Sequence, residues 1–594
     1  MKNPFINSKI IIFLIITYPL LFIWQGLDFA DEGFCLTNYQ QIFNDPESVS
    51  YGIGSWLTNI IGGLWILLFG DSLGVIGARF AGVLVVYLTI VFSYLLLKPY
   101  IGRKYLLIGL LFASLFTKWY YLLFYNSLTS LFFVASAFFL INGLKNNKHW
   151  QIIVSGLLLG LNIFIRFPNI LGFSLVLSIF FYGYINKNKI RVQIIQTISF
   201  IFGYTIAILV TVLIMKVLGH YDLFVNGMKW IFTVSKETTG HHNLKGLMTI
   251  YYMEYLKVIG FTAIAIPLVI IMPKVFMKLK NQYLYKGSII FLITFASLLF
   301  MLALLRYYDI MRFLIVLIVG ILYVILLAYI IKIEKSSSDF RLVCFITLLI
   351  LFITPMGSTV GLRNAIYGMW IPIPIASTYI LRLKKLGMQF ETATDSSMNQ
   401  FKFRLNQKEV DLTKKIVIIS LIVFSLLSSF IYTYRDSSNR FQMRYSVDNP
   451  RLRGILMTKE RAKAIQELLD EMGRYVKEND YLLAYQEISM VYFLTRTKPY
   501  LYNSQPFLYR TYEFKNALDR ATKERIYLPV IVREKINIWD FNWPKGSIPF
   551  TRDDRKAENS GIMEEFIERN GYLLVWENDS FEILIPPSEI NGKK

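Results

Sequence analysis

Three carboxylates follow the first apolar segment of the chain, within residues 28–34, which read DFADEGF. If the apolar segment spans a bilayer, Asp28, Asp31 and Glu32 stand where the membrane surface begins. A carboxylate at the mouth of an apolar helix bundle can act as a general base or bind a cation. The alternative is solvation, because acids beside a membrane span often mark only the start of the aqueous phase.

A second set of candidates is a pair of histidines, His241 and His242, in the segment 219–248. Asp222 and Glu237 lie in the same segment, and these residue types are common metal ligands. Adjacent histidine side chains diverge on most backbones, however, and no ligand spacing is evident. We therefore interpret the two histidines as ordinary loop residues. The sequence predicts no cofactor, with a divalent metal at His241 and His242 left open.

The elements that must position these residues are apolar helices. Of the 594 residues, 55% are hydrophobic and the mean hydropathy is +0.47, which excludes intrinsic disorder and leaves too little polar surface for a soluble multidomain chain. Crossing a bilayer takes roughly 20 apolar residues. We therefore predict an α-helical polytopic membrane protein. Its thirteen predicted spans lie at about 9–27, 76–97, 105–121, 127–143, 150–166, 168–185, 193–218, 249–272, 287–305, 310–331, 342–356, 365–381 and 416–434.

The basic residues predict the orientation of these spans. The formal net charge is +22, and alternate loops between the spans carry 25 Lys and Arg against six acids. Because cytoplasmic loops retain Lys and Arg, these loops and the N-terminus face the cytoplasm. Residues 56–70 are also apolar, but counting them as a span would invert every later loop. We therefore predict an interfacial helix there, inside an outer loop at 28–75, and no nucleic-acid partner.

The composition changes after Tyr434. From residue 435 to 594 the basic and acidic residues nearly balance, and short mixed segments replace the long apolar ones. The alternation of elements predicts a soluble α/β domain on the outer side. The predicted domains are thus 1–434, transmembrane and catalytic, and 435–594, extracytoplasmic. The predicted helices of the second domain lie at about 458–475, 512–523 and 562–570, and its strands at 480–486, 527–532, 571–576 and 580–585.

Several short motifs, in order along the membrane part, resemble those of the GT-C glycosyltransferases. This superfamily includes the protein O-mannosyltransferases and the bacterial aminoarabinose transferases. Thirteen spans with an outer C-terminal domain also resemble the aminoarabinose transferase layout. The motifs are the adjacent pair Asp31-Glu32, Leu68-Phe69-Gly70 with Gly77-Ala78-Arg79-Phe80, Gly156 and Gly160 leading to Arg166-Phe167-Pro168, and Arg312-Phe313-Leu314.

The resemblance implies that a sugar moves from a polyprenyl-phosphate carrier, with inversion, to a lipid, glycan or protein acceptor at the outer face of the plasma membrane. Such a reaction belongs to the synthesis of cell-envelope glycans or glycolipids. An acceptor hydroxyl needs a base, and the resemblance assigns that role to Asp31. Glu32 is the second predicted catalytic acid, which orients the loop or the acceptor.

The leaving phosphate needs fixed positive charge in a poorly hydrated site. Arg306, Asp309 and Arg312 are spaced i, i+3 and i+6, so they share one side of a continuous helix. The alternative for any one arginine is snorkelling toward lipid headgroups. The predicted phosphate-binding and substrate-binding residues, all at outer ends of spans, are Arg166, Arg306, Arg312 and Arg363, together with Asn126, which stands where many GT-C enzymes have Asp.

Two other functions stay open. An oligosaccharide polymerase or ligase would use the same kind of carrier, and sequence alone separates it poorly from a single-sugar transferase. A non-enzymatic transporter or flippase of lipid-linked saccharides would usually have internal repeats and charges near the bilayer midplane. We find no repeat, and the charges gather at the outer ends of the spans.

Overall fold

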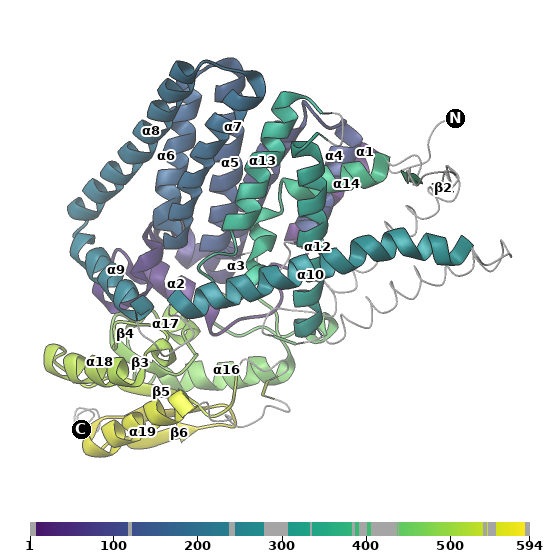
Figure 1. Ribbon diagram of the computed structural model, residues 1–594. Coiled ribbons are helices and arrows are strands. Elements are labelled where there is room, and N and C mark those ends of the chain that lie inside the picture. The colour runs from purple at the N-terminus through teal and green to yellow at the C-terminus, as the bar shows by residue number, and fades with distance from the viewer. Residues whose placement is uncertain are drawn as a thin grey trace.

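Figure 1 presents the protein as a computed structural model, in which a bundle of long helices carries a small α/β region at one end. The fold is therefore mostly helical, with one small C-terminal sheet. The structure describes residues 7–116, 122–236, 244–277, 307–332, 336–382, 387–390, 401–404, 436–437, 439–538, 543–544 and 554–587.

The helices of the bundle follow most of the predicted apolar segments. The predicted spans 287–305 and 416–434 and the end of 105–121 lie outside the described residues. A short hairpin, β1 (Gly387–Phe390) with β2 (Phe401–Arg404), follows the bundle. The helical segments are α1 (Ser8–Leu20), α2 (Asp31–Gln41), η1 (Pro46–Ser55), α3 (Trp56–Leu97), α4 (Arg103–Phe116), α5 (Tyr125–Asn146), α6 (His149–Ile165), η2 (Phe167–Val176), α7 (Leu177–Asn186), α8 (Ile190–Val217), α9 (Tyr221–Lys236), α10 (Leu244–Met277), α12 (Tyr307–Ile330), α13 (Ser338–Ile353), η3 (Gly361–Gly368) and α14 (Pro372–Arg382).

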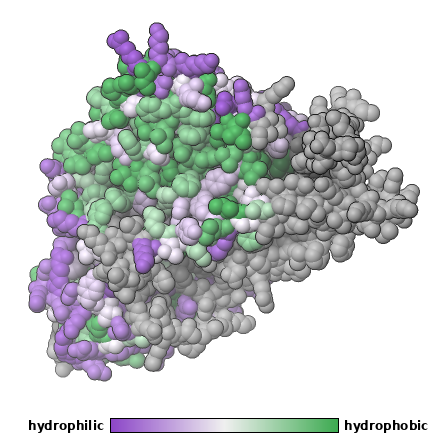
Figure 2. Space-filling view, in the orientation of Figure 1, coloured by the Kyte–Doolittle hydropathy of each residue, from purple (hydrophilic) through white to green (hydrophobic). Residues whose placement is uncertain are grey.

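Several of these segments could cross a membrane. Among the described residues, four are long and apolar enough, namely Pro46–Leu97, Tyr125–Asn146, Phe167–Asn186 and Ile190–Val217, and three shorter apolar helices accompany them. Figure 2 shows hydrophobic side chains spread over the helices, with hydrophilic residues at the far end of the bundle and over the α/β region. The predicted polytopic membrane fold is confirmed at this level, whereas the number of thirteen spans stays a prediction.

The predicted interfacial helix and the span after it form one element, α3, with a kink at Gly74. This residue has φ +50° and ψ −135°, a conformation that side chains with a Cβ rarely adopt. A Cβ on Gly74 would also lie 2.2 Å from the backbone carbonyl oxygen of Arg451 in the C-terminal region. The kink therefore lies where the C-terminal region contacts α3.

Glycines allow α6 and α8 to pack backbone to backbone. A Cβ on Gly156 would lie 2.1 Å from the carbonyl oxygen of Phe200, and one on Gly203 would lie 2.0 Å from that of Ile153. Small residues at such contacts are the usual way for membrane helices to approach closely, since lipid supplies no hydrophobic force between helices. Gly156, the first glycine of the Gly156–Gly160 motif, thus has a packing role.

The C-terminal region is a five-stranded sheet with helices on both faces. The strand order is β4-β3-β5-β7-β6, in which β3, β4 and β5 are parallel and β7 is antiparallel to both its neighbours. The predicted α/β alternation is present, although the short α17 and β4 were not predicted. The elements are α16 (Lys459–Met472), β3 (Tyr481–Tyr485), α17 (Met490–Thr495), β4 (Lys498–Pro499), α18 (Thr511–Glu524), β5 (Val530–Glu534), α19 (Asp554–Arg569), β6 (Leu573–Glu577) and β7 (Phe581–Ile585), with short 3-10 turns η4 (Arg440–Gln442), η5 (Pro450–Leu452) and η6 (Pro506–Leu508).

One face of this sheet shares its core with the bundle. Alternate strand residues point to opposite faces. Leu482 and Val532 pack in the same apolar cluster as Leu36 of α2 and Val75 of α3, whereas Leu483 packs on the other face, in a cluster with residues of α18 and α19. The α/β region is thus joined to α2 and α3 through a continuous core. The predicted domain boundary between residues 434 and 435 stays a prediction.

Candidate functional site

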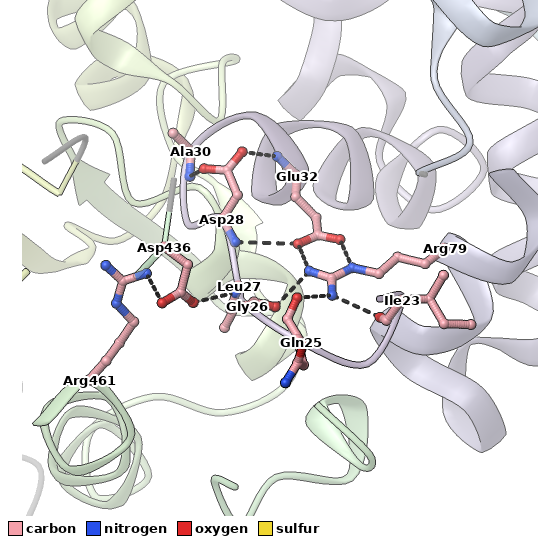
Figure 3. Close-up of polar contacts among 10 residues, drawn as sticks. All are labelled: Ile23, Gln25, Gly26, Leu27, Asp28, Ala30, Glu32, Arg79, Asp436 and Arg461. Atoms are coloured by element: carbon pink, nitrogen blue, oxygen red, sulfur yellow. Dashed lines mark hydrogen bonds and ion pairs between the residues drawn. The ribbon is translucent and has the colours of Figure 1, made fainter. Parts of the chain in front are cut away.

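The first acid of the DFADEGF segment, Asp28, stabilises the start of α2. The carboxylate of Asp28 accepts hydrogen bonds from the backbone N–H groups of Ala30 (3.0 Å) and Glu32 (3.0 Å), as Figure 3 shows. N–H groups in the first turn of a helix have no partner within the helix, so this side chain caps α2. Asp28 is buried, which makes it part of the scaffold of the site.

Glu32 forms a buried ion pair with Arg79 of α3. Its two carboxylate oxygens accept from Nε (2.7 Å) and Nη2 (2.6 Å) of Arg79, and the side chains are only 1% and 11% exposed. Arg79 also donates to the carbonyl oxygens of Ile23 and Gly26 (Figure 3). The pair therefore joins two of the motifs that resemble those of GT-C enzymes and ties the segment after α1 to α2 and α3.

The α/β region holds α2 from the other side. The backbone N–H of Met490, at the start of α17, donates to the carbonyl oxygen of Phe29 (2.9 Å), and the Thr37 hydroxyl donates to the carbonyl oxygen of Ser489 (3.0 Å). A Cβ on Gly33 would lie 2.1 Å from the Met490 nitrogen. The glycine that follows the acid pair is therefore required for this close approach.

A second buried ion pair holds the segment just before α2. Asp436 accepts from the backbone N–H of Leu27 (2.8 Å) and pairs with Arg461 of α16 (2.9 Å), and both charged side chains are fully buried (Figure 3). The Arg461 guanidinium also lies over the Trp543 ring, 4.2 Å from its centroid. Burial lowers the pKa of Arg461, and the Asp436 charge opposes that shift. The approach to α2 is thus set by residues more than 400 positions away.

The C-terminal end of α2 is held by a buried histidine, His220, in the turn between α8 and α9. The indole Nε1–H of Trp56 donates to its Nδ1 (3.1 Å), and the ring also interacts with the carbonyl of Ile42, which ends α2. Burial lowers the pKa of His220, so the neutral ring is favoured. The tautomer that accepts from Trp56 carries its proton on Nε2.

Asp31 lies in the first turn of α2 and is half-buried. One residue on an α-helix turns by about 100°, so Asp31 and Glu32 point to different sides. The charge of Asp31 acts on the buried Cys35 one turn along α2 and on the hydroxyls of Tyr125 and Tyr367. Whereas Glu32 is bound to Arg79, the charge of Asp31 acts on residues of α5 and η3.

Tyr367 of η3 is the point at which several predicted site residues meet. Its hydroxyl interacts with the Asn126 side chain and with the charges of Arg166, Asp31 and Arg363. Asn126 is buried in the first turn of α5, and Arg363 lies one turn before Tyr367 in η3. Four of the predicted site residues therefore act on one tyrosine, three through their charges and Asn126 through its side chain.

Sequence reasoning missed both tyrosines of this cluster. Tyr125 stands next to Asn126, which was the only available signal for it, and Tyr367 lies inside an apolar segment that was predicted to be a span. In a chain with 38 tyrosines, most of them suited to a membrane interface, residue type alone does not distinguish these two.

Arg166, which follows α6, points into the protein. Its Nη1 donates to the carbonyl oxygen of Thr354 (3.0 Å) and its Nη2 to that of Met356 (2.8 Å). The residue is 7% exposed, so its guanidinium contacts the segment before η3 instead of lipid headgroups.

The remaining predicted residues fall outside the description. Arg306, His241 and His242 lie outside the described residues, and α12 contains Arg312 but the placement of its side chain is not described. Within the described part of the chain, no three His, Cys, Asp or Glu side chains lie close enough together to hold a metal ion.

Comparisons with known proteins find resemblance among solved structures. No family profile matches the chain, and no curated protein sequence matches it. The solved structures that it resembles include an archaeal oligosaccharyltransferase and ArnT. One is the Archaeoglobus fulgidus oligosaccharyltransferase in complex with Zn and sulfate, with a TM-score of 0.44, 11% identity, and coverage of 89% of this chain and 67% of that one.

Two further structures were solved with a lipid phosphate. Oligosaccharyltransferase AglB from Archaeoglobus fulgidus, with an inhibitory peptide and a dolichol-phosphate, matches at a TM-score of 0.45 and 11% identity, over 89% of this chain and 69% of that one. ArnT from Cupriavidus metallidurans, bound to undecaprenyl phosphate, matches at 0.39 and 11%, over 97% and 98%. With TM-scores below 0.5, these likenesses assign neither an activity nor a residue role to this chain.

Proposed function

We propose that this chain is a membrane glycosyltransferase that moves a sugar from a polyprenyl-phosphate carrier to an acceptor hydroxyl, with inversion, in the synthesis of cell-envelope glycans or glycolipids. The observation that carries the proposal is that a carboxylate, that of Asp31, and a cation, Arg363, act on the same Tyr367 hydroxyl, which also interacts with the Asn126 side chain. A base beside a cation is what transfer from a phosphate carrier requires.

In this proposal Asp31 removes the proton from the acceptor hydroxyl as its oxygen attacks the anomeric carbon of the sugar. The bond between that carbon and the phosphate oxygen breaks on the opposite face, and the phosphate stays on the carrier with the electron pair. Attack from the opposite face inverts the configuration at the carbon. General base catalysis of this kind contributes about 100-fold to 10,000-fold to a rate.

The phosphate that leaves gains negative charge, and Arg363 is the cation that we propose to bind it. A charged hydrogen bond from a guanidinium is strongest in a poorly hydrated site. Arg363 is half-buried, and its neighbours Leu362 and Ala365 in η3 are fully buried. Asn126 and Tyr367 would bind uncharged oxygens of the sugar or the phosphate.

Glu32 has a different role in this proposal. Both of its carboxylate oxygens are bound to Arg79, and the side chain is buried away from solvent. It therefore positions α2, and through α2 it positions Asp31, while Asp31 alone acts as the base.

We also propose the orientation that the basic loops predict. The multi-pass protein lies in the plasma membrane with its N-terminus in the cytoplasm, and the α/β region and Asp31 are extracytoplasmic. The helix α2, which begins at Asp31, and the α/β region are at the same end of the bundle, which is consistent with this assignment (Figure 1).

The test is mass spectrometry of carrier lipids and envelope glycans from a deletion strain that carries variants of the gene. Asp31→Asn should accumulate the carrier-linked sugar and lack the glycosylated acceptor, as the deletion does. The matched control is Asp222→Asn, an exposed acid in the first turn of α9 that should restore the product. Restoration of the product by Asp31→Asn would exclude the proposed base.

A further inference from the structure

Arg166 was predicted to bind the phosphate of the carrier, but its contacts suit another role. Its guanidinium donates to two backbone carbonyls, those of Thr354 and Met356, at 3.0 and 2.8 Å. A guanidinium carries its N–H groups in a rigid planar fork, so two such bonds fix the position of the segment that accepts them. That segment, residues 354–361, runs from the end of α13 into the first residue of η3.

A second contact holds the same segment. Pro168, two residues after Arg166, packs against Gly357, where a Cβ would lie 2.3 Å from the proline Cγ. Gly357 has φ +71°, which favours glycine by itself. The Arg166-Phe167-Pro168 motif therefore contacts residues 354–357 in two ways, through the hydrogen bonds of Arg166 and through the packing of Pro168.

Residues 354–361 are followed directly by residues of the proposed site. Arg363 and Tyr367 follow within η3, and the far end of η3 is held by the Ser130 hydroxyl, which donates to the carbonyl oxygen of Tyr367 (2.7 Å). The positions of both side chains relative to Asp31 thus depend on what holds the start of the segment.

We infer that Arg166 is a positioning residue, which holds residues 354–361 so that Arg363 meets the carrier phosphate, and that it does not bind the phosphate itself. The inference rests on the proposed function for the role of Arg363, but the contacts of Arg166 and Pro168 with residues 354–357 are independent of that function. Two of the five N–H groups of Arg166 are bound to carbonyl oxygens of this segment, and a phosphate that turned the guanidinium toward itself would break those two bonds.

Substitution of Arg166 by lysine distinguishes a phosphate-binding role from a positioning role. Arg166→Lys keeps the positive charge but replaces a planar fork with a single ammonium on a flexible chain. A ligand of the phosphate should tolerate this change in large part, since Lys also binds phosphate as a point charge. A residue that must hold two carbonyls at fixed positions should not.

The first measurement is hydrogen–deuterium exchange on the purified full-length protein in lipid nanodiscs. The amide of Gly361 is bonded to the Ser358 carbonyl (3.1 Å) and reports on the segment. Arg166→Lys and Arg166→Gln should each raise exchange in residues 357–368 by roughly tenfold to a hundredfold. Arg191→Gln, an exposed arginine of α8, is the matched control and should leave it unchanged.

The second measurement is binding of undecaprenyl phosphate by the same variants. If Arg166 acts through Arg363, then Arg166→Lys weakens binding in the wild-type background, by about tenfold, but has no further effect in the Arg363→Gln background. If Arg166 touches the phosphate, the two losses add, which would overturn the inference. A role in stability alone would not make the effect of Arg166 on affinity depend on Arg363.

The outcomes separate the inference from the function on which it rests. Wild-type protein that fails to bind undecaprenyl phosphate, or active Asp31→Asn protein, counts against the proposed function. The exchange measurement still tests whether Arg166 holds residues 354–361 in place. Unchanged exchange in both Arg166 variants overturns the inference even if the transferase activity is proven. If Arg166→Gln does not accumulate, Arg166→Lys and Pro168→Ala carry the exchange test, and Pro168→Ala should loosen the same residues by a few-fold.

Discussion

Exchange of Glu32 for glutamine tests whether this acid positions α2. The variant keeps the shape of the side chain but leaves the buried charge of Arg79 without its counter-charge. Breaking a buried ion pair by removing one partner costs about 3–5 kcal/mol. Arg79 keeps its bonds to the carbonyl oxygens of Ile23, Gln25 and Gly26. We therefore expect the lower end of that range, about 3 kcal/mol.

Asp31→Asn should have little effect on stability but a large effect on transfer. Asp31 is the first residue of α2, where a negative charge is worth about 0.3–1 kcal/mol through its interaction with the helix dipole. Its loss therefore costs less than about 1 kcal/mol of stability. Under the proposed function it should nevertheless lower transfer by about 100-fold or more.

The assay is equilibrium unfolding of the purified protein, followed by tryptophan fluorescence, together with glycan transfer in cells. The double variant Glu32→Gln with Arg79→Gln should regain part of the stability lost in Glu32→Gln, because no unpaired buried charge remains. The reasoning is refuted if Glu32→Gln is as stable as wild type while Asp31→Asn is strongly destabilised.

Three further predictions concern the contacts around α2 and within the bundle. Gly33→Ala should disrupt the packing of α2 on α17, since its Cβ would lie 2.1 Å from the Met490 nitrogen, and should lower the unfolding midpoint; an unchanged midpoint would contradict the contact. His220 has a lowered pKa, so the stability it contributes should be complete above about pH 6.5, the ordinary value for histidine, and decline as pH falls toward the lowered pKa. Unfolding midpoints between pH 7.5 and 5 should therefore fall more in wild type than in His220→Gln, and equal slopes would argue against the shift. Gly203→Ala, whose Cβ would lie 2.0 Å from a backbone oxygen of α6, should lower the yield of folded protein in detergent, whereas the lipid-facing Ile198→Ala should not.

The helical part of the fold could be predicted because hydropathy acts locally. An apolar stretch such as that in α8 identifies its own helix without reference to any distant partner. The orientation that the basic residues of alternate loops indicate stays a prediction. The strands β6 and β7 were likewise predicted from short apolar runs. The helix α17, only six residues long, and β4, of two residues, are too short to carry a periodic pattern.

The site was predictable only in part, because residue type indicates charge but not the partner of that charge. Asp31 and Glu32 are adjacent acids with the same family resemblance, yet only the structure shows that one of them is bound to Arg79. Arg166 was predicted to bind phosphate because it is a cation at the end of a span. Its partners are backbone carbonyls, and no side-chain pattern in the sequence marks a carbonyl that lies 188 residues away.

The same reasoning explains why the site needs the C-terminal region. The helix α2 has 11 residues, and an isolated helix of that length is marginal in water. It is held by Arg79, by the backbone of Met490 and, through Leu27, by the buried Asp436. Two of these three partners lie after residue 434, the end of the predicted catalytic domain. The placement of Asp31 therefore depends on both predicted domains, so a catalytic domain that ends at residue 434 lacks two of the contacts that position its base.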